Sequence, residues 1–191
     1  MLLSLVAVLI GLRLLAQLIL DALNAAAVRR HGDAPPPAVA AIMDAATHAR
    51  TVAYTLAKQR FGMIEELWEA ALLAAILFSG ALPALYARVA APAPGAAWSG
   101  ALFLLLVGVL LSLTGLPFDW WGQFRLEARF GFNQSTPGLW VADKIKGLLL
   151  AAGIGFPLLW ALLALVRWTG PWWWLWGFAG LFLVQLLMLV L

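Results

Sequence analysis

Long runs of apolar residues, separated by polar stretches, dominate the hydrophobic pattern of this 191-residue chain. A helix of about 20 mostly apolar residues is long enough to cross a lipid bilayer. Stretches of that kind cover residues 2–21, 66–87, 98–117, 147–167 and 171–190. The pattern therefore predicts an all-α polytopic membrane protein with five transmembrane helices. We expect residues 1–191 to form a single membrane domain.

Two of the connections are long enough to have structure of their own, residues 22–65 and residues 118–146. In the first, Asp33 precedes a run of prolines, which is a typical signal for the start of a helix. Apolar residues then recur at helical spacing as far as Phe61. This spacing predicts an amphipathic helix over residues 38–61 that runs into the second span. Such a helix could lie on the membrane surface or pack on another domain.

The composition agrees with a membrane protein and excludes other classes. Hydrophobic residues make up 64% of the chain and charged residues only 11%, whereas soluble domains average about 25% charged residues. The chain has no cysteine, so disulfides and thiolate metal sites are excluded. The net charge is +3, and the basic residues flank apolar spans without forming a solvated patch. We therefore expect no nucleic-acid partner.

The distribution of Lys and Arg predicts an orientation in the membrane. The four connections contain five, one, four and one of these residues, in chain order. Connections rich in Lys and Arg tend to face the cytoplasm. We therefore expect connections 22–65 and 118–146 to be cytoplasmic, with the N-terminus on the outer side.

The side chains that carry hydrolytic chemistry are scarce. The chain has two histidines, and neither belongs to an HExxH motif, in which two imidazoles one helical turn apart bind zinc. His31 lies in a polar linker, and His48 falls on the polar side of the predicted amphipathic helix. No Ser/His/Asp set or glycine-rich phosphate loop is present. We therefore expect no catalytic residue and no metal ligand in this chain.

The connection 118–146 has local signals of an ordered structure. Thr136 followed by Pro137 is typical of a helix start. Asp143 and Lys146 are three residues apart, so on that helix they share a face and can pair. Gly131 permits a tight bend or a positive φ between two phenylalanines. Two interpretations stay open: a loop that ties the third and fourth spans together, or a lip over a cavity that contacts a substrate or a partner domain.

The residues of this connection also form a recognisable series. It consists of Pro117-Phe118-Asp119, Phe124 to Asn133 (FRLEARFGFN), Thr136 and Asp143-Lys144-Ile145-Lys146. The series resembles the type 1 CAAX prenyl protease family, which are integral-membrane zinc metalloproteases. Asn24 and the segment Tyr54-x-x-x-Lys58-x-x-Phe61-Gly62 match further features of that family.

The resemblance implies a ring of membrane helices around a water-filled chamber, with zinc near its cytoplasmic side. It also implies that HExxH belongs to a C-terminal peptidase domain that is not among these residues. We expect the chain to be a truncation or a separately encoded domain, which by itself binds no zinc and is inactive. The implied substrates are prenylated C-terminal peptides in eukaryotes or other membrane-associated polypeptides in bacteria. The Ala-, Leu- and Trp-rich composition favours a bacterial inner membrane.

In that setting the chain has the lipid bilayer, the peptidase domain and a peptide or protein substrate as partners. Its role is to enclose the chamber and shape the substrate groove. The residues that we expect to make groove or interdomain contacts are Glu127, Phe132, Asn133, Thr136, Asp143 and Lys146. The alternative is a non-enzymatic membrane scaffold or assembly subunit that keeps the motif for helix packing.

Overall fold

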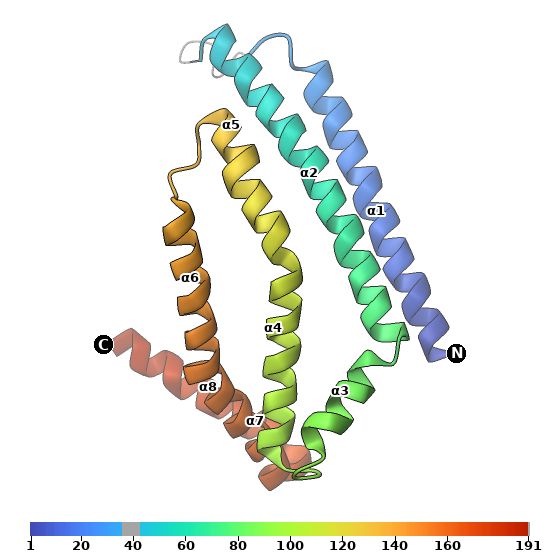
Figure 1. Ribbon diagram of the computed structural model, residues 1–191, viewed down its shortest axis with the longest axis vertical. Coiled ribbons are helices and arrows are strands. Elements are labelled where there is room, and N and C mark those ends of the chain that lie inside the picture. Colours follow the sequence, from blue (N-terminus) through green and yellow to red (C-terminus); the bar gives the residue numbers. More distant parts are fainter. Residues whose placement is uncertain (36–42, 191) are drawn as a thin grey trace. The chain divides into compact units, whose positions relative to one another are not determined.

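A computed structural model describes residues 1–35 and 43–190 of the chain. All regular secondary structure in these residues is helical (Figure 1). The helices form two compact units, each taken by itself below. Unit 1 comprises Met1–Ala81 and Leu116–Gln134, and unit 2 comprises Leu82–Gly115 and Ser135–Leu191.

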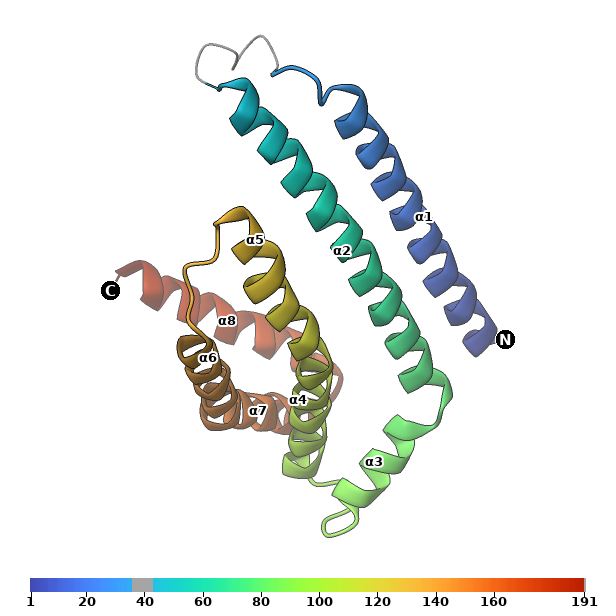
Figure 2. The same ribbon diagram turned by 45° about the horizontal axis from the view of Figure 1, so that its top comes forward.

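Two long helices, α1 (Leu2–Arg30) and α2 (Ala45–Phe78), lie side by side in unit 1 (Figures 1 and 2). Helix α1 is nine residues longer than the apolar run that predicted it, and its last turn carries Arg29 and Arg30. Cations suit this end because the helix dipole is negative there. The side-chain amide of Gln59 on α2 donates a hydrogen bond to the backbone carbonyl of Asp21 on α1.

Helix α2 does not begin at the proline run after Asp33. Its N-cap is Asp44, whose carboxylate accepts a hydrogen bond from the backbone N–H of Thr47 at 2.7 Å. Hydrogen bonding from Thr47 holds the pKa of Asp44 below its ordinary value, because it stabilises the charged carboxylate. Within the described residues, the predicted amphipathic helix over residues 38–61 is helical from Ala45 onward and continues to Phe78. Its first residues, up to Ile42, lie outside the described part of the chain.

The end of the second predicted span is interrupted. Helix α2 ends at Phe78, Gly80 has a φ of 74°, and α3 begins at Ala81 and ends at Ala90. A positive φ is accessible to glycine without strain, so Gly80 breaks the helix at this point.

The polar connection 118–146 is helical except at residues 131–136, which corrects the expectation of a loop in its first part. Helix α4 (Ala97–Trp121) continues through a π-helix η1 (Gly122–Glu127) and a short α5 (Ala128–Phe130). Only residues 131–136 are extended or irregular before α6 begins at Pro137. The apolar run ends near residue 117, but the backbone hydrogen bonding of the helix does not.

The remaining helices belong to unit 2. Helix α6 (Pro137–Leu150), π-helix η2 (Ala151–Gly155) and α7 (Phe156–Thr169) follow one another without a break. A short 3₁₀ helix η3 (Gly170–Trp172), in which Gly170 has a φ of 55°, then leads into α8 (Trp173–Val190). This is the tight turn that the sequence predicts between the last two spans.

The helices are long and apolar enough to cross a membrane. Three continuous stretches of the described residues qualify, and a fourth qualifies if α2 and α3 count as one broken span. The third stretch, Pro137–Leu189, has 53 residues. At a rise of 1.5 Å per residue it would measure about 80 Å, more than twice the roughly 30 Å of a bilayer core. It must therefore cross more than once, and the turn at Gly170 divides it.

Candidate functional site

The π-helix η1 lies where the sequence series is densest. A π-helix widens the helical turn, and short π segments are frequent at functional sites. Gly122 begins this segment against the ring of Phe61 on α2, where an added Cβ would lie 3.5 Å from the nearest ring carbon. Phe118, one turn earlier, contacts Phe61 and Trp68, with ring centroids 6.1 and 6.0 Å apart. This aromatic seam packs the segment on α2 within unit 1.

Glu127, the last residue of η1, has two partners on α2. The phenol of Tyr54 donates a hydrogen bond to its carboxylate at 2.6 Å, and the Lys58 ammonium lies 4.0 Å from the same oxygen. Lys58 also donates to the Tyr54 oxygen at 3.3 Å. The Glu127 side chain is 29% exposed, so water screens the ion pair only in part. The hydrogen bond from Tyr54 is therefore the stronger link between η1 and α2.

Phe130 and Phe132 both contact the ring of Tyr54 edge-on. The ring centroids lie 5.2 and 4.8 Å apart, at interplanar angles of 68° and 65°. Phe130 is 7% exposed and Phe132 is 54% exposed. Phe130 thus anchors the end of α5, whereas Phe132 keeps much of its ring available for contact.

Gly131 makes this arrangement possible. Its φ is 79°, in the left-handed region, as the sequence predicts. Its N–H bonds to the carbonyl of Ala128 and the N–H of Phe132 bonds to the carbonyl of Glu127, which is the Schellman pattern of helix termination. The helix therefore ends at this glycine, and the chain turns back so that two phenylalanines flank one tyrosine.

Arg50 completes the cluster and was not singled out by the sequence. Its guanidinium donates a hydrogen bond to the carbonyl of Phe130, 80 residues away. It lies so close that a Cβ added to Gly131 would be 2.9 Å from its Nη2 atom. The four-residue spacing of Arg50, Tyr54 and Lys58 on one face of α2 was the signal that could have revealed it. We call Arg50, Tyr54, Lys58, Glu127, Phe130 and Phe132 the Tyr54 cluster.

The six residues predicted to make groove or interdomain contacts divide between the two units. Asn133 joins Glu127 and Phe132 in unit 1, where its side-chain oxygen accepts a hydrogen bond from Gln123 at 3.3 Å. Thr136 belongs to unit 2 and caps α6, accepting from the N–H of Leu139 at 3.2 Å.

Asp143 and Lys146 also belong to unit 2, on α6. They form the predicted pair, with 3.7 Å between charged atoms, and their side chains are 60% and 69% exposed. The Lys144 ammonium lies 5.3 Å from the centroid of the Trp140 ring. The charges of Asp143 and Lys146 are thus solvated and paired with each other.

The described residues do not supply a metal site. Among residues 1–35 and 43–190, no three His, Cys, Asp or Glu side chains come together as metal ligands would. His31 instead contacts the carbonyl of Ala27 at 2.9 Å, at the end of α1. His48 is buried at 9% exposure, which corrects the expectation that it lies on a polar face. These residues do not fit a zinc ion, and no step of a zinc mechanism can be assigned to them.

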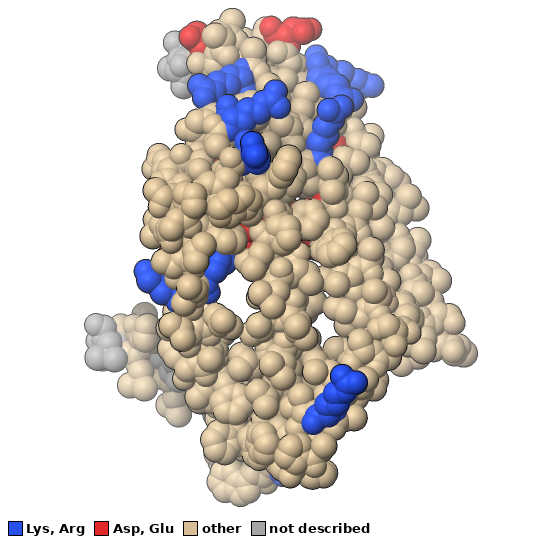
Figure 3. All heavy atoms as spheres, viewed as in Figure 1, with Lys and Arg blue, Asp and Glu red and all other residues tan. Residues whose placement is uncertain are grey.

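Many of the cations of unit 1 lie at one end. In Figure 3, Lys and Arg atoms crowd the end of the unit where α1 finishes and α2 begins. Together, the geometry and hydropathy define an all-helical, multi-pass membrane protein whose polar cluster lies at the charged end of two long helices.

Comparison with known proteins identifies the family. The family model described as the CAAX prenyl protease N-terminal region, with five membrane helices, matches residues 24–191. The chain belongs to this family, as the sequence resemblance predicted. The zinc metalloprotease character expected of the intact enzyme agrees with the family in general.

Individual relatives of the chain are CAAX prenyl proteases. The CAAX prenyl protease 1 homolog of Oryza sativa subsp. japonica is 30% identical over 165 residues, covering 82% of this chain and 38% of that protein. The Homo sapiens homolog is 29% identical over 164 residues, covering 82% and 34%. The crystal structure of S. mikatae Ste24p shares the fold, with a TM-score of 0.88 and 22% identity over 98% of this chain and 45% of that one. The chain therefore spans less than half the length of these relatives, which are eukaryotic.

Proposed function

We propose that this chain is the membrane half of a CAAX-protease-like zinc endopeptidase, and that it encloses an intramembrane chamber and shapes the substrate groove. Polypeptide outside these 191 residues would contribute the HExxH motif and the zinc. Two observations support this division: the sequence contains no HExxH, and the chain spans 38% of the rice relative's length. Prenylated or other membrane-associated polypeptides would be the substrates.

The orientation is part of the proposal. The end of unit 1 that carries Arg29, Arg30 and Arg50 would face the cytoplasm. The N-terminus, at the other end of α1, would then be outside. This orientation would place the Tyr54 cluster on the cytoplasmic side, where the family places its zinc.

The observation that carries the proposal is the fixed position of residues 122–133. Contacts from three residues of α2 hold this segment although they are 69 to 80 residues away in sequence. A mere connector between spans needs no such support. We infer that the segment is a preorganised lip whose half-exposed Phe132, together with Asn133, contacts the substrate peptide or the peptidase domain. Glu127 would position this lip without touching the reacting bond.

Asp143, Lys146 and the capping residue Thr136 have a different part in the proposal. The side chains of Asp143 and Lys146 are mostly exposed, so they are available for contact with a peptidase domain. An exposed pair contributes little to the chain's own stability, so its exchange for interdomain contacts costs little free energy.

The first experiment determines the DNA sequence next to the coding region of this chain. The polypeptide that this DNA encodes is then expressed together with the chain. An HExxH-bearing polypeptide that co-purifies with the chain, binds zinc and cleaves a prenylated or membrane-associated peptide would support the proposal. Stoichiometric zinc and peptidase activity in the 191-residue chain alone would contradict the division of labour. Co-purification of the chain with a membrane assembly that contains no peptidase would favour the scaffold alternative.

A second experiment tests whether Phe132 contributes to peptide hydrolysis separately from any role in folding. In the assembled enzyme, Phe132→Ala should lower kcat/KM for peptide hydrolysis while leaving zinc content unchanged, because Phe132 is half exposed and Phe130 keeps the buried contact. Leu139→Ala, also at a half-exposed apolar side chain (50%), is the matched control. Asp143→Lys should weaken co-purification with the peptidase part. Unchanged co-purification and activity would contradict its docking role.

A further inference from the structure

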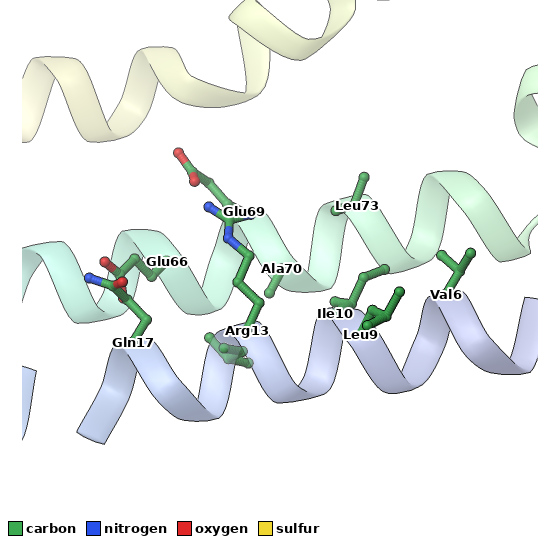
Figure 4. A pocket seen from close by; sticks show the side chains of 10 residues that line it. Val6, Leu9, Ile10, Arg13, Gln17, Glu66, Glu69, Ala70 and Leu73 are labelled. Atoms are coloured by element: carbon green, nitrogen blue, oxygen red, sulfur yellow. The ribbon is translucent and has the colours of Figure 1, made fainter. Parts of the chain in front are cut away.

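A cavity of about 590 Å³ lies between α1 and α2, within unit 1 and apart from the Tyr54 cluster. Its lining changes character along the helices (Figure 4). Arg13, Gln17, Glu66 and Glu69 line one end, and apolar residues that include Ile10 and Leu73 line the other. Cavities that hold small molecules have volumes of about 300–1,000 Å³, so this one is large enough for a ligand.

The polar end carries more negative than positive charge. Arg13 extends from α1 toward α2 (Figure 4). Glu66 is hydrogen-bonded to Asp21 and Gln17 on α1 and interacts electrostatically with Arg13. One oxygen of Glu66 is buried and has no hydrogen-bond partner within the described residues. Charged side chains within a membrane span are costly unless they are paired, so an excess of carboxylates here calls for a cation.

The cavity is polar on the side of Asp21 and apolar further along α1, which is the order of groups along an amphiphile. Asp21 ends the first apolar run, and Gln17 and Arg13 lie about 6 and 12 Å deeper along the helix. Ile10 and the rest of the apolar lining continue beyond them, toward the N-terminus of α1. An amphiphile that enters from the end where α1 meets the α1–α2 connection would place its head at the charges and its chain on the apolar wall.

We propose that this cavity binds a phospholipid whose headgroup contains a phosphate and a primary ammonium, such as phosphatidylethanolamine. Arg13 pairs with the phosphate, because a guanidinium suits phosphate oxygens. Glu66 and Glu69 accept hydrogen bonds from the ammonium, which has three N–H donors. The quaternary ammonium of phosphatidylcholine has no N–H donor, so the site discriminates between the two lipids. This inference does not depend on the peptidase proposal.

The test measures which lipid the 191-residue chain retains. The chain is extracted from vesicles of equal parts phosphatidylethanolamine, phosphatidylcholine and phosphatidylglycerol with matched acyl chains, and bound lipid is measured by native mass spectrometry. We expect about tenfold enrichment of phosphatidylethanolamine over phosphatidylcholine, the ratio expected from roughly one charge-assisted hydrogen bond. Equal retention of the three lipids, or preference for phosphatidylglycerol, would overturn the assignment.

Variants locate the site. The double change Glu66→Gln and Glu69→Gln should abolish the enrichment. Glu65→Gln, on the same helix but outside the cavity lining, should preserve it. Equal loss in both variants would contradict the proposal, and circular dichroism of each variant checks that the helices remain folded.

A second measurement uses the unaltered chain, so it does not depend on the folding of a variant. A phosphatidylethanolamine with a photoreactive group in one acyl chain should label peptides that contain Ile10 or Leu73, and unlabelled phosphatidylethanolamine should compete. Labelling confined to α6–α8 would exclude this cavity as the site.

Discussion

Glu127 and Asp143 come from the same polar stretch of sequence, yet the fold uses them in opposite ways. Glu127 is 29% exposed and is bonded to Tyr54, 73 residues away in the chain. Asp143 is 60% exposed and pairs with Lys146, three residues away on the same helix. Packing between distant segments holds the first carboxylate, whereas helix geometry alone places the second. The two residues should therefore differ in what their loss does to the fold.

The largest effect is expected at Gly131, which ends α5 next to Arg50. In Gly131→Ala the methyl group would adopt an unfavourable left-handed conformation and displace the guanidinium that lies 2.9 Å away. We expect a loss of about 2 kcal/mol in the free energy of unfolding, measured in bicelles.

Gly138→Ala is the control for this change. Gly138 lies in α6, has no positive φ, and an added Cβ would have no atom within 4 Å. Alanine should leave the free energy of unfolding unchanged or raise it by up to about 1 kcal/mol. Equal losses in the free energy of unfolding at the two glycines would mean that the positive φ of Gly131 and its closeness to Arg50 have no specific effect on stability.

Tyr54→Phe removes one oxygen and keeps the ring between Phe130 and Phe132. The Glu127 carboxylate loses its 2.6 Å hydrogen bond while remaining partly buried. We expect a loss of about 1–2 kcal/mol in the free energy of unfolding. Tyr86→Phe in α3, whose ring contacts Phe103 at 5.4 Å, is the matched control and should change stability by less than about 0.5 kcal/mol. Comparable losses in both variants would mean that the hydrogen bond between Tyr54 and Glu127 does not contribute specifically to the free energy of unfolding.

Thr136→Ala tests the contribution of a local cap. The N–H of Leu139 loses the hydroxyl that accepts its hydrogen bond, so α6 should fray at its first turn. We expect a loss of about 1 kcal/mol in stability and faster amide exchange at Leu139, with both restored in Thr136→Ser. If Thr136→Ala instead abolished peptide hydrolysis in the assembled enzyme with no change in exchange, Thr136 would have a direct role in the groove.

The smallest effect on stability is expected for the Asp143–Lys146 pair. A double-mutant cycle of Asp143→Asn and Lys146→Gln should give a coupling energy of at most about 0.5 kcal/mol, lower still at high salt. A coupling energy above about 1.5 kcal/mol would mean that this pair stabilises the fold as much as the contacts of Glu127 do, as a buried or networked pair would.

The sequence by itself determined the features that depend on neighbouring residues. The apolar runs predicted a multi-pass helical protein, and Thr136, Gly131 and the Asp143–Lys146 pair have the predicted cap, positive φ and ion pair. Each of these features spans no more than five residues. Helix geometry and backbone sterics decide such features locally, so they can be predicted without knowing the fold.

Only the tertiary structure decided where helices end and which distant groups meet. The polar residues after position 117 predicted a loop, but the helix continues to Phe130, because its end depends on Gly131 and on packing against α2 and not on hydropathy. Arg50 was absent from the predicted site because its partner is the carbonyl of Phe130, 80 residues away. The spacing of Arg50, Tyr54 and Lys58 could place Arg50 on the same helix face. It could not identify the carbonyl of Phe130 as the partner, because every residue has a backbone carbonyl.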